Sequence, residues 1–197
     1  MPKLVLATRN QGKVKEMRRL MQAHPEIEII SVADFDIGDV EETGATFEEN
    51  ALLKAETIAR ATGLAAMADD SGLCVDALDG APGIYSARWS GVHGDDAANI
   101  EKLLAQMEKV DDRSAQFVCV IALCSPDGRH LLIRGELEGS VRRSRAGNNG
   151  FGYDPIFEPN GMNVTLAEVS PEKKDEISHR GKALRAIAPE IAPFLQR

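Results

Sequence analysis

Two adjacent carboxylates, Asp69 and Asp70, follow a short apolar run and precede Ser71 and Gly72. Hard divalent cations such as Mg²⁺ bind oxygens of this kind, commonly from one or two protein carboxylates together with the phosphates of a substrate. The same residue types also favour simple turns. The segment therefore predicts a strand that reaches a bend after Asp70, with either a metal-binding role or a purely structural one. Residues 73–78 either continue this strand or return across the sheet.

Residues 8–13, Thr-Arg-Asn-Gln-Gly-Lys, lie between a strand-like run and a helical pattern. The backbone N–H groups at a helix N-terminus favour anions, and Lys13 adds a positive charge there. The Gly-x-x-x-x-Gly-Lys-Ser/Thr pattern of a P-loop is absent. The segment therefore indicates either a phosphate-binding turn or an ordinary strand–helix connection.

A glycine-rich segment with two aromatic residues occupies positions 147–154. Its glycines permit close approach of the backbone to a ligand, and Phe151 or Tyr153 offers a ring on which a base could stack. A flexible loop with buried aromatics is the alternative. The cationic residues Lys174, His179 and Arg180 follow on a late helical segment, where they are either surface residues or part of a site.

The elements that would position these groups alternate between strands and helices. Apolar runs predict strands at 3–7, 26–31, 65–70, 113–125 and 129–141. A periodicity of 3.6 residues predicts helices after Lys13, from Thr46 to Gly63, after Asp95 and from Ser170 to Pro189. The Pro126-Asp-Gly128 turn joins two of the strands as a hairpin. A mixed α/β sheet is expected, with ligands bound at strand ends.

Composition narrows the function further. The 197 residues carry a net charge of −8, which argues against a nucleic-acid-binding protein. No apolar run has the length of a membrane span and no signal peptide is evident, so we expect a cytoplasmic protein. Cys74, Cys119 and Cys124 form no Cys-x-x-Cys pair, which argues against disulfides and against zinc.

Seven segments in order resemble one family, the non-canonical purine nucleoside triphosphate pyrophosphatases. They are residues 6–13 (LATRNQGK), 41–44 (EETG), 49–55 (ENALLKA), 68–73 (ADDSGL), 80–88 (GAPGIYSAR), 150–157 (GFGYDPIF) and 177–184 (ISHRGKAL). The resemblance implies Mg²⁺-dependent hydrolysis of ITP, dITP or XTP to the monophosphate and pyrophosphate, which clears deaminated purines. It also implies a single domain over residues 1–197, an elongated mixed sheet with flanking helices, two lobes around a central substrate cleft, and a homodimer.

The resemblance assigns roles residue by residue. Asp70 would be the catalytic base and a metal ligand, and Glu42 the second metal ligand, although the sequence does not choose between Glu42 and Glu41. The implied substrate-binding residues are Thr8, Arg9, Asn10, Gln11, Gly12, Lys13, Lys54, Ser71, Phe151, Gly152, Tyr153, Asp154, Lys174, His179 and Arg180. Arg9 stands where the family often has a small residue, so its side chain either contacts phosphate or points away.

Within this set, residues 8–13 and Lys54 would hold the triphosphate, and residues 151–154 would form the nucleobase wall, with Phe151 stacking. The late cations would donate to the 6-oxo group of the purine, which adenine lacks. Other possibilities are a hydrolase of modified pyrimidine triphosphates, a metal-dependent phosphatase that releases orthophosphate, and a nucleotide-binding protein without catalysis.

Overall fold

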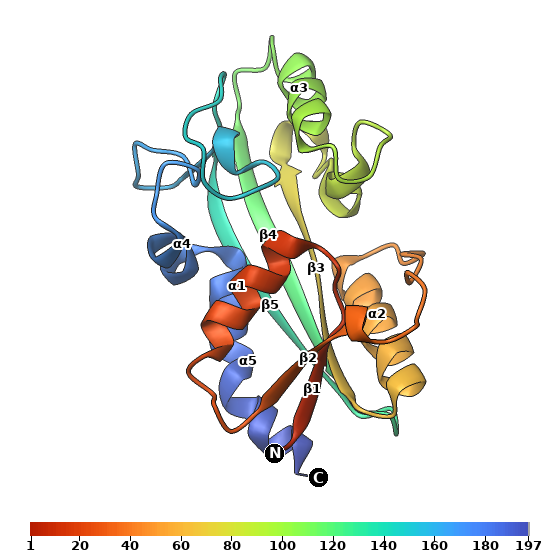
Figure 1. The fold of residues 1–197 in the computed structure, drawn as a ribbon. Coiled ribbons are helices and arrows are strands. Elements are labelled where there is room, and N and C mark those ends of the chain that lie inside the picture. Colours follow the sequence, from red (N-terminus) through yellow and green to blue (C-terminus); the bar gives the residue numbers. More distant parts are fainter. Residues whose placement is uncertain (197) are drawn as a thin grey trace. The chain divides into compact units, whose positions relative to one another are not determined.

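The computed structural model describes residues 1–196 (Figure 1). Its strands are β1 (Lys3–Leu6), β2 (Glu28–Ser31), β3 (Ala65–Val75), β4 (Ser114–Cys124), β5 (His130–Val141) and β6 (Phe157–Pro159). Its α-helices are α1 (Gln11–Met21), α2 (Phe47–Thr62), α3 (Asp96–Gln106), α4 (Pro171–Ile177) and α5 (His179–Leu195). Short 3₁₀ helices include η2 (Asp76–Leu78) and η3 (Gly83–Arg88). No helix among the described residues is long and apolar enough to span a bilayer.

The strands form one sheet in the order β2-β1-β3-β4-β5-β6. β1 pairs in parallel with both β2 and β3, whereas β5 pairs antiparallel with β6. β4 and β5 are neighbours joined by a tight turn, in which Gly128 N donates to Ser125 O at 3.0 Å. The expected mixed sheet with flanking helices is confirmed.

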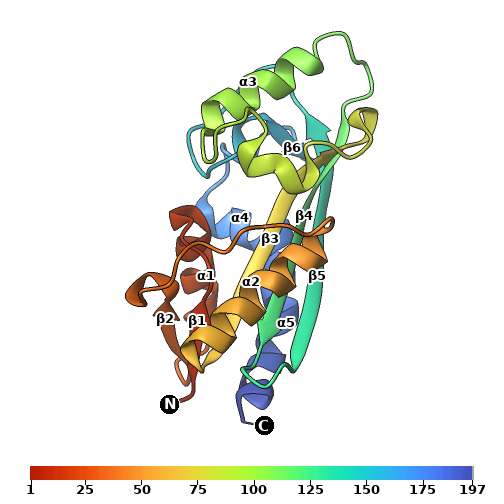
Figure 2. The same ribbon diagram turned by 90° about the vertical axis from the view of Figure 1, so that its right-hand side faces the viewer.

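The chain divides into two compact units. Unit 1 comprises residues 1–70, 119–135 and 181–197, and unit 2 comprises residues 71–118 and 136–180. In unit 1, alternate residues of the strands, such as Leu4 and Ile121, pack against α1 and α5. Figure 2 shows α2 along the opposite face of these strands. Helices on both faces bury β1, which leads directly into the predicted site residues from Thr8 onward.

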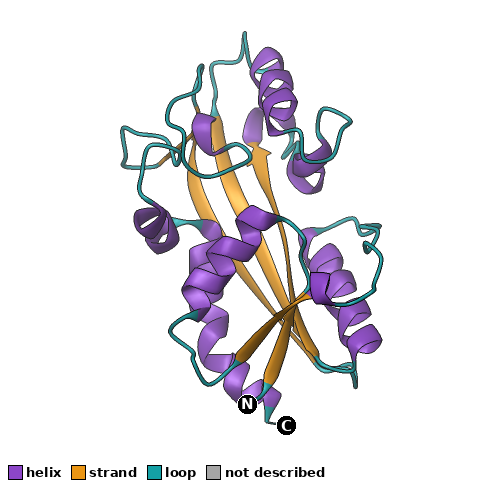
Figure 3. Cartoon of the chain, in the orientation of Figure 1, coloured by secondary structure: helices purple, strands orange, loops and turns teal. Residues whose placement is uncertain are grey.

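Unit 2 has its own core. Leu73 and Val75 of β3 pack there with Leu103 of α3, Phe117 of β4 and Phe157 of β6. Residues 142–170 are mostly loops and turns (teal in Figure 3), and they carry the glycine-rich segment. These loops are therefore anchored to the core by buried side chains.

Two sequence predictions about elements are wrong. β3 does not end at a bend after Asp70, because it continues as one strand to Val75 (Figure 3). The final helix does not end at Pro189, because α5 contains Pro189 and Pro193. The burial of Ile191 and Phe194 against the unit 1 core offsets the cost of the missing backbone donors. Ser178 is extended (φ −68°, ψ 158°) and separates α4 from α5.

Candidate active site

A cluster of carboxylates and lysines lies within unit 1. Asp69 and Asp70 come from the middle of β3, and Lys13 comes from the first turn of α1. Lys13 Nζ lies 2.9 Å from Asp69 Oδ2, whose side chain has no exposed surface. Lys54 Nζ from α2 lies 3.5 Å from Asp70 Oδ1. Each carboxylate of the Asp-Asp pair therefore lies within ion-pair distance of a lysine.

Glu42 completes this acid–lysine cluster. Its Oε1 accepts a hydrogen bond from Lys54 Nζ at 2.5 Å, whereas Glu41 is exposed to solvent. The loop before α2 is held in place by Asn50, whose Oδ1 accepts from Gly44 N at 2.8 Å. A Cβ on Gly44 would lie 2.7 Å from that oxygen, so the close approach requires glycine. The structure thus turns Glu42, and not Glu41, toward the lysine.

Burial and charge act together on this cluster. Burial raises the pKa of Asp70 above its ordinary value, and Lys54 and Lys13 only partly oppose that shift. Burial alone would lower the pKa of Lys54, but the charges of Asp70, Glu42 and Asp69 outweigh it, so that the pKa is raised. Lys54 is therefore held charged, and Asp70 is a stronger base than an exposed aspartate.

The segment predicted to bind phosphate lies at the N-terminus of α1. Asn10 is the N-cap, and its Oδ1 accepts from Lys13 N at 3.1 Å. Thr8 Oγ1 accepts from Asn10 N at 3.3 Å, and Gln11 Nε2 donates to the carbonyl oxygen of Arg9 at 3.3 Å. Gly12 lies in the first turn of the helix. The backbone donors of this turn form a site that favours anions.

Arg9 has other partners in this structure. Its Nε lies 2.8 Å from Asp39 Oδ1, and its guanidinium also donates to the Ile37 carbonyl oxygen. Arg9 thus ties the acidic loop before α2 to the start of α1.

A second group of predicted residues lies within unit 2, around Phe151. Asp154 Oδ2 accepts from Lys174 Nζ at 2.6 Å and from Phe151 N at 2.9 Å. Lys174 Nζ lies 4.6 Å from the centre of the Phe151 ring, and the Arg180 guanidinium carbon 5.5 Å from it. A Cβ on Gly150 would lie 2.0 Å from Asp154 Oδ2, so this turn requires glycine. These contacts form an aromatic–cation cluster.

The first turn of α5 carries Arg180 and His179, which make further contacts within unit 2. Arg180 donates to Ser71 Oγ at 3.1 Å. The His179 ring stacks on Phe117, with centroids 4.6 Å apart and planes 7° apart. Gly152 N donates to Asp96 Oδ2 at 2.7 Å, which ties the glycine-rich segment to α3.

The predicted site residues are thus gathered in two groups. Unit 1 holds Thr8, Arg9, Asn10, Gln11, Gly12, Lys13, Glu42, Lys54 and Asp70, and unit 2 holds Ser71, Phe151, Gly152, Tyr153, Asp154, Lys174, His179 and Arg180. The peptide bond between Asp70 and Ser71 is one of the four points at which the chain passes from one unit to the other. The Tyr153 side chain packs in the unit 2 core with only 4% exposed, and Asp154 beside it is also buried.

Sequence reasoning named Asp69 as a candidate carboxylate but did not assign the supporting roles that the structure gives to residues of both groups. Asp69 holds Lys13, Asn50 holds the loop that carries Glu42, and Asp96 holds the glycine-rich segment. An asparagine on a helix face gives no sign of burial. Only its spacing of four residues from Lys54 could have suggested a role.

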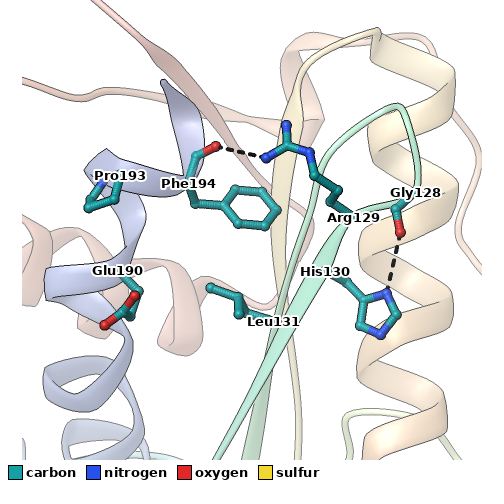
Figure 4. Close-up of a pocket in the computed structure, with 7 residues that line it drawn as sticks. All are labelled: Gly128, Arg129, His130, Leu131, Glu190, Pro193 and Phe194. Atoms are coloured by element: carbon teal, nitrogen blue, oxygen red, sulfur yellow. Dashed lines mark hydrogen bonds between the residues drawn. The ribbon is translucent and has the colours of Figure 1, made fainter. Parts of the chain in front are cut away.

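A pocket of about 340 Å³ lies elsewhere in unit 1, between the β4–β5 turn and the end of α5 (Figure 4). Its lining residues are Gly128, Arg129, His130, Leu131, Glu190, Pro193 and Phe194. The Arg129 guanidinium covers the Phe194 ring at 5.1 Å and donates to its carbonyl oxygen at 3.4 Å. None of the predicted site residues is among these lining residues, and Glu190 is the one carboxylate among them in the described part of the chain.

Comparison with known proteins gives a consistent picture. The model of the Ham1 family matches residues 4–190. A dITP/XTP pyrophosphatase of Streptomyces avermitilis is 53% identical over an alignment of 199 residues, which covers 99% of this chain and all of the relative. A solved structure of a HAM1 protein from Coxiella burnetii has a TM-score of 0.90 and 45% identity over 98% of this chain and 100% of that one. The crystal structure of a Mycobacterium abscessus nucleoside-triphosphatase, a dITP/XTP pyrophosphatase, has a TM-score of 0.77 and 49% identity over 96% and 99% of the two chains.

Proposed function

The chain belongs to the Ham1 family, and from that premise we propose that it is a nucleoside triphosphate pyrophosphatase for deaminated purine nucleotides. Its substrates are dITP, XTP and ITP, and its products are the nucleoside monophosphate and pyrophosphate. The reaction clears these nucleotides from the pool available for nucleic-acid synthesis. The acid–lysine cluster of Asp69, Asp70, Glu42, Lys13 and Lys54 is the observation that carries the proposal.

The donor set of the cluster fits a magnesium ion. Among residues 1–196, no group of three or more His, Cys, Asp or Glu side chains is arranged to hold a metal by itself. Mg²⁺ commonly binds through one or two carboxylates together with substrate phosphates, so a complete protein cage is not needed. Asp70 and Glu42 would hold the ion in this proposal. When bound, Mg²⁺ neutralises phosphate charge.

The residues of unit 1 then act on the triphosphate. Asp70 accepts a proton from the attacking water, a role for which a buried carboxylate of raised basicity is suited. Lys13, Lys54 and the N-terminal donors of α1 bind phosphate oxygens. Asp69 keeps Lys13 in place through the buried ion pair.

The residues of unit 2 recognise the base. Phe151 provides a stacking surface, and Lys174, His179 and Arg180 provide hydrogen-bond donors. A donor that faces position 6 of the purine favours a 6-oxo group. It would be left unpaired against the 6-amino group of adenine, and that cost gives the selectivity. Asp154 keeps Lys174 and the Phe151 backbone together.

The proposal also includes a homodimer and a cytoplasmic location. The net charge of −8 fits a metal-screened nucleotide site better than a nucleic-acid surface. Light scattering during size-exclusion chromatography measures the oligomeric state directly. A monomer at micromolar concentration would remove the dimer from the proposal and leave the reaction unaffected.

The experiment that tests the reaction is a turnover panel of ITP, dITP, XTP, GTP, ATP and dUTP with Mg²⁺. Pyrophosphate and orthophosphate are measured separately. We expect pyrophosphate release from ITP, dITP and XTP, and much slower turnover of the other nucleotides. Orthophosphate release would indicate a phosphatase that attacks a different phosphorus, and a preference for dUTP would indicate a pyrimidine-directed enzyme. Binding without turnover would leave a nucleotide-binding protein.

A further inference from the structure

The second half of β3 has an unusual neighbour along one of its edges. β1 pairs with β3 only at Ala65–Met67. Farther along β3, Val75 N donates to Ala81 O at 3.1 Å, and Leu73 N donates to Ser86 Oγ at 2.9 Å. The segment 81–86 therefore takes the place of a strand beside the part of β3 that follows Asp70 and Ser71.

Ser86, in η3, makes three hydrogen bonds from a buried position. Its Oγ accepts from Leu73 N and donates to Gly83 O at 2.6 Å. Its carbonyl oxygen accepts from the Tyr153 hydroxyl at 2.9 Å. Ser86 is 7% exposed and Tyr153 is 4% exposed, so neither set of bonds has water as a ready substitute.

The packing around Ser86 leaves little room for adjustment. A Cβ on Gly72 would lie 2.2 Å from Gly83 O and 2.6 Å from Ser86 Oγ. The backbone of β3 thus rests directly on η3. A substitution of Ser86 must therefore alter the positions of Gly72 and Leu73, the residues that directly follow Ser71.

The geometry points to Ser86 as a positioning residue that links two substrate-binding segments of the enzyme. Its hydroxyl fixes the β3 backbone two residues after Ser71, and its carbonyl oxygen fixes Tyr153, two residues after Phe151. The inference rests on the proposed function, because it assigns Ser86 a task only if these segments act on a nucleotide. Tyr153 then serves through its buried hydroxyl as the anchor of the glycine-rich segment.

The interactions of the Ser86 hydroxyl and of its carbonyl oxygen can be removed separately. Ser86→Ala removes the hydroxyl and leaves the carbonyl oxygen. It therefore removes the hydrogen bond to the β3 backbone and keeps the one to Tyr153. We expect kcat to fall on the order of 10- to 100-fold for every substrate, because small displacements of reacting groups have costs of that size. The ratio of kcat/KM between dITP and GTP should stay within about 2-fold. Tyr153→Phe removes the hydrogen bond to the Ser86 carbonyl oxygen. We expect KM for dITP to rise about 3- to 10-fold, since one neutral hydrogen bond is lost.

A matched variant separates positioning from simple loss of stability. Ser90→Ala makes the same change four residues away, at a hydroxyl that has no hydrogen-bond partner among residues 1–196. Its kcat and KM should equal those of the wild type. Thermal melting of each variant gives the folded fraction, to which the rate constants are normalised.

Each outcome has a defined meaning. A wild-type protein that releases no pyrophosphate would overturn the proposed function. An active wild-type protein whose Ser86→Ala variant keeps its kcat would overturn only the inference. The inference would also be overturned if Ser86→Ala and Tyr153→Phe changed the melting temperature but not the split between kcat and KM. Because Tyr153→Phe keeps the ring, it provides this test even where Ser86→Ala folds poorly.

Discussion

Two buried lysine–carboxylate groups in this chain are built alike and have opposite surroundings. In unit 1, Lys54 pairs with Glu42 and Asp70, and a further carboxylate, Asp69, lies close enough to affect the pKa of Lys54. In unit 2, Lys174 pairs with Asp154 beside Phe151 and Arg180. Carboxylates are in excess in the first group and cations in the second.

The difference shows how one kind of ion pair supports two kinds of recognition. An excess of carboxylates suits a site completed by a metal ion and phosphates, since the added cation restores the charge balance. An excess of cations beside an aromatic ring suits a planar base with electron-rich oxygens. The ion pair fixes the geometry in both cases, and the surplus charge determines which ligand is favoured.

The largest effect is expected for a substitution within the acid–lysine cluster of unit 1. Asp70→Asn keeps the shape of the side chain but removes the proton acceptor, so kcat should fall by roughly 10²- to 10⁴-fold. Binding of dITP measured by calorimetry without metal should change little. The exposed Asp76→Asn serves as a control with unchanged kcat. Near-normal turnover of Asp70→Asn would mean that another group is the base.

A substitution within the aromatic–cation cluster of unit 2 should instead affect substrate selectivity. Lys174→Ala removes a donor, and we expect the preference for dITP over ATP to fall by about 10-fold or more. The variant also removes the Lys174 ion pair of the buried Asp154 carboxylate, so the free energy of unfolding should fall by about 3–5 kcal/mol. Both quantities can be measured, by competition kinetics and by urea denaturation.

Two further variants make the comparison sharper. Lys173→Ala changes the neighbouring lysine, whose partner is the exposed Glu176, and should leave selectivity unchanged. Lys54→Ala should lower kcat and leave the ratio of kcat/KM between dITP and ATP unchanged. If Lys54→Ala altered the ratio as much as Lys174→Ala, the division of roles between the two groups would be wrong.

A smaller effect is expected at the strand that carries residues of both groups. Gly72→Ala places a Cβ against Gly83 O at 2.2 Å, and the required shift should cost about 1–3 kcal/mol of stability. The matched control is Gly38→Ala, because a Cβ there meets nothing within 4 Å. Equal melting temperatures for the two variants would contradict the close packing of η3 on β3.

The smallest effect concerns a carboxylate outside both groups. Hydrogen bonds from the Ser125 hydroxyl and from Arg129 lower the pKa of Asp127 from 3.8 to about 2. Because the folded-state pKa is the lower one, this carboxylate stabilises the fold above the unfolded-state value, and the stabilisation is lost as pH falls through about 2. Asp127→Asn should flatten the dependence of stability on pH in that range, as measured by urea unfolding at several pH values. A curve parallel to that of the wild type would argue against these hydrogen bonds.

The sequence predicted the local structure well wherever short-range chemistry controls it. Thr46 caps α2 as expected, with its Oγ1 accepting from Glu49 N at 3.1 Å, and Gly63 ends the helix at φ 67°. The Glu49 side chain also takes part, because its Oε2 accepts from Ala45 N at 2.6 Å. The capping atoms lie within four residues of one another, so sequence spacing is enough to place them.

The errors occurred where distant residues decide the conformation. Asp-Asp-Ser-Gly has turn-forming residues, but β3 runs straight through them because β4 and the η3 segment supply its hydrogen bonds. Gly72 is needed for close packing and not for a bend. Pro189 was expected to end the last helix, but contacts of Ile191 and Phe194 with the core keep that helix intact.

The sequence by itself determined the mixed α/β class, the family resemblance and the residues of both groups, because residue types, periodicity and motif order are properties of the chain. Only the tertiary structure decided that Glu42 faces Lys54, that Arg9 is held by the acidic loop, and that Ser86 joins β3 to Tyr153. Each of these depends on a contact between segments more than ten residues apart. Such contacts arise from the packing of the core, which no local pattern encodes.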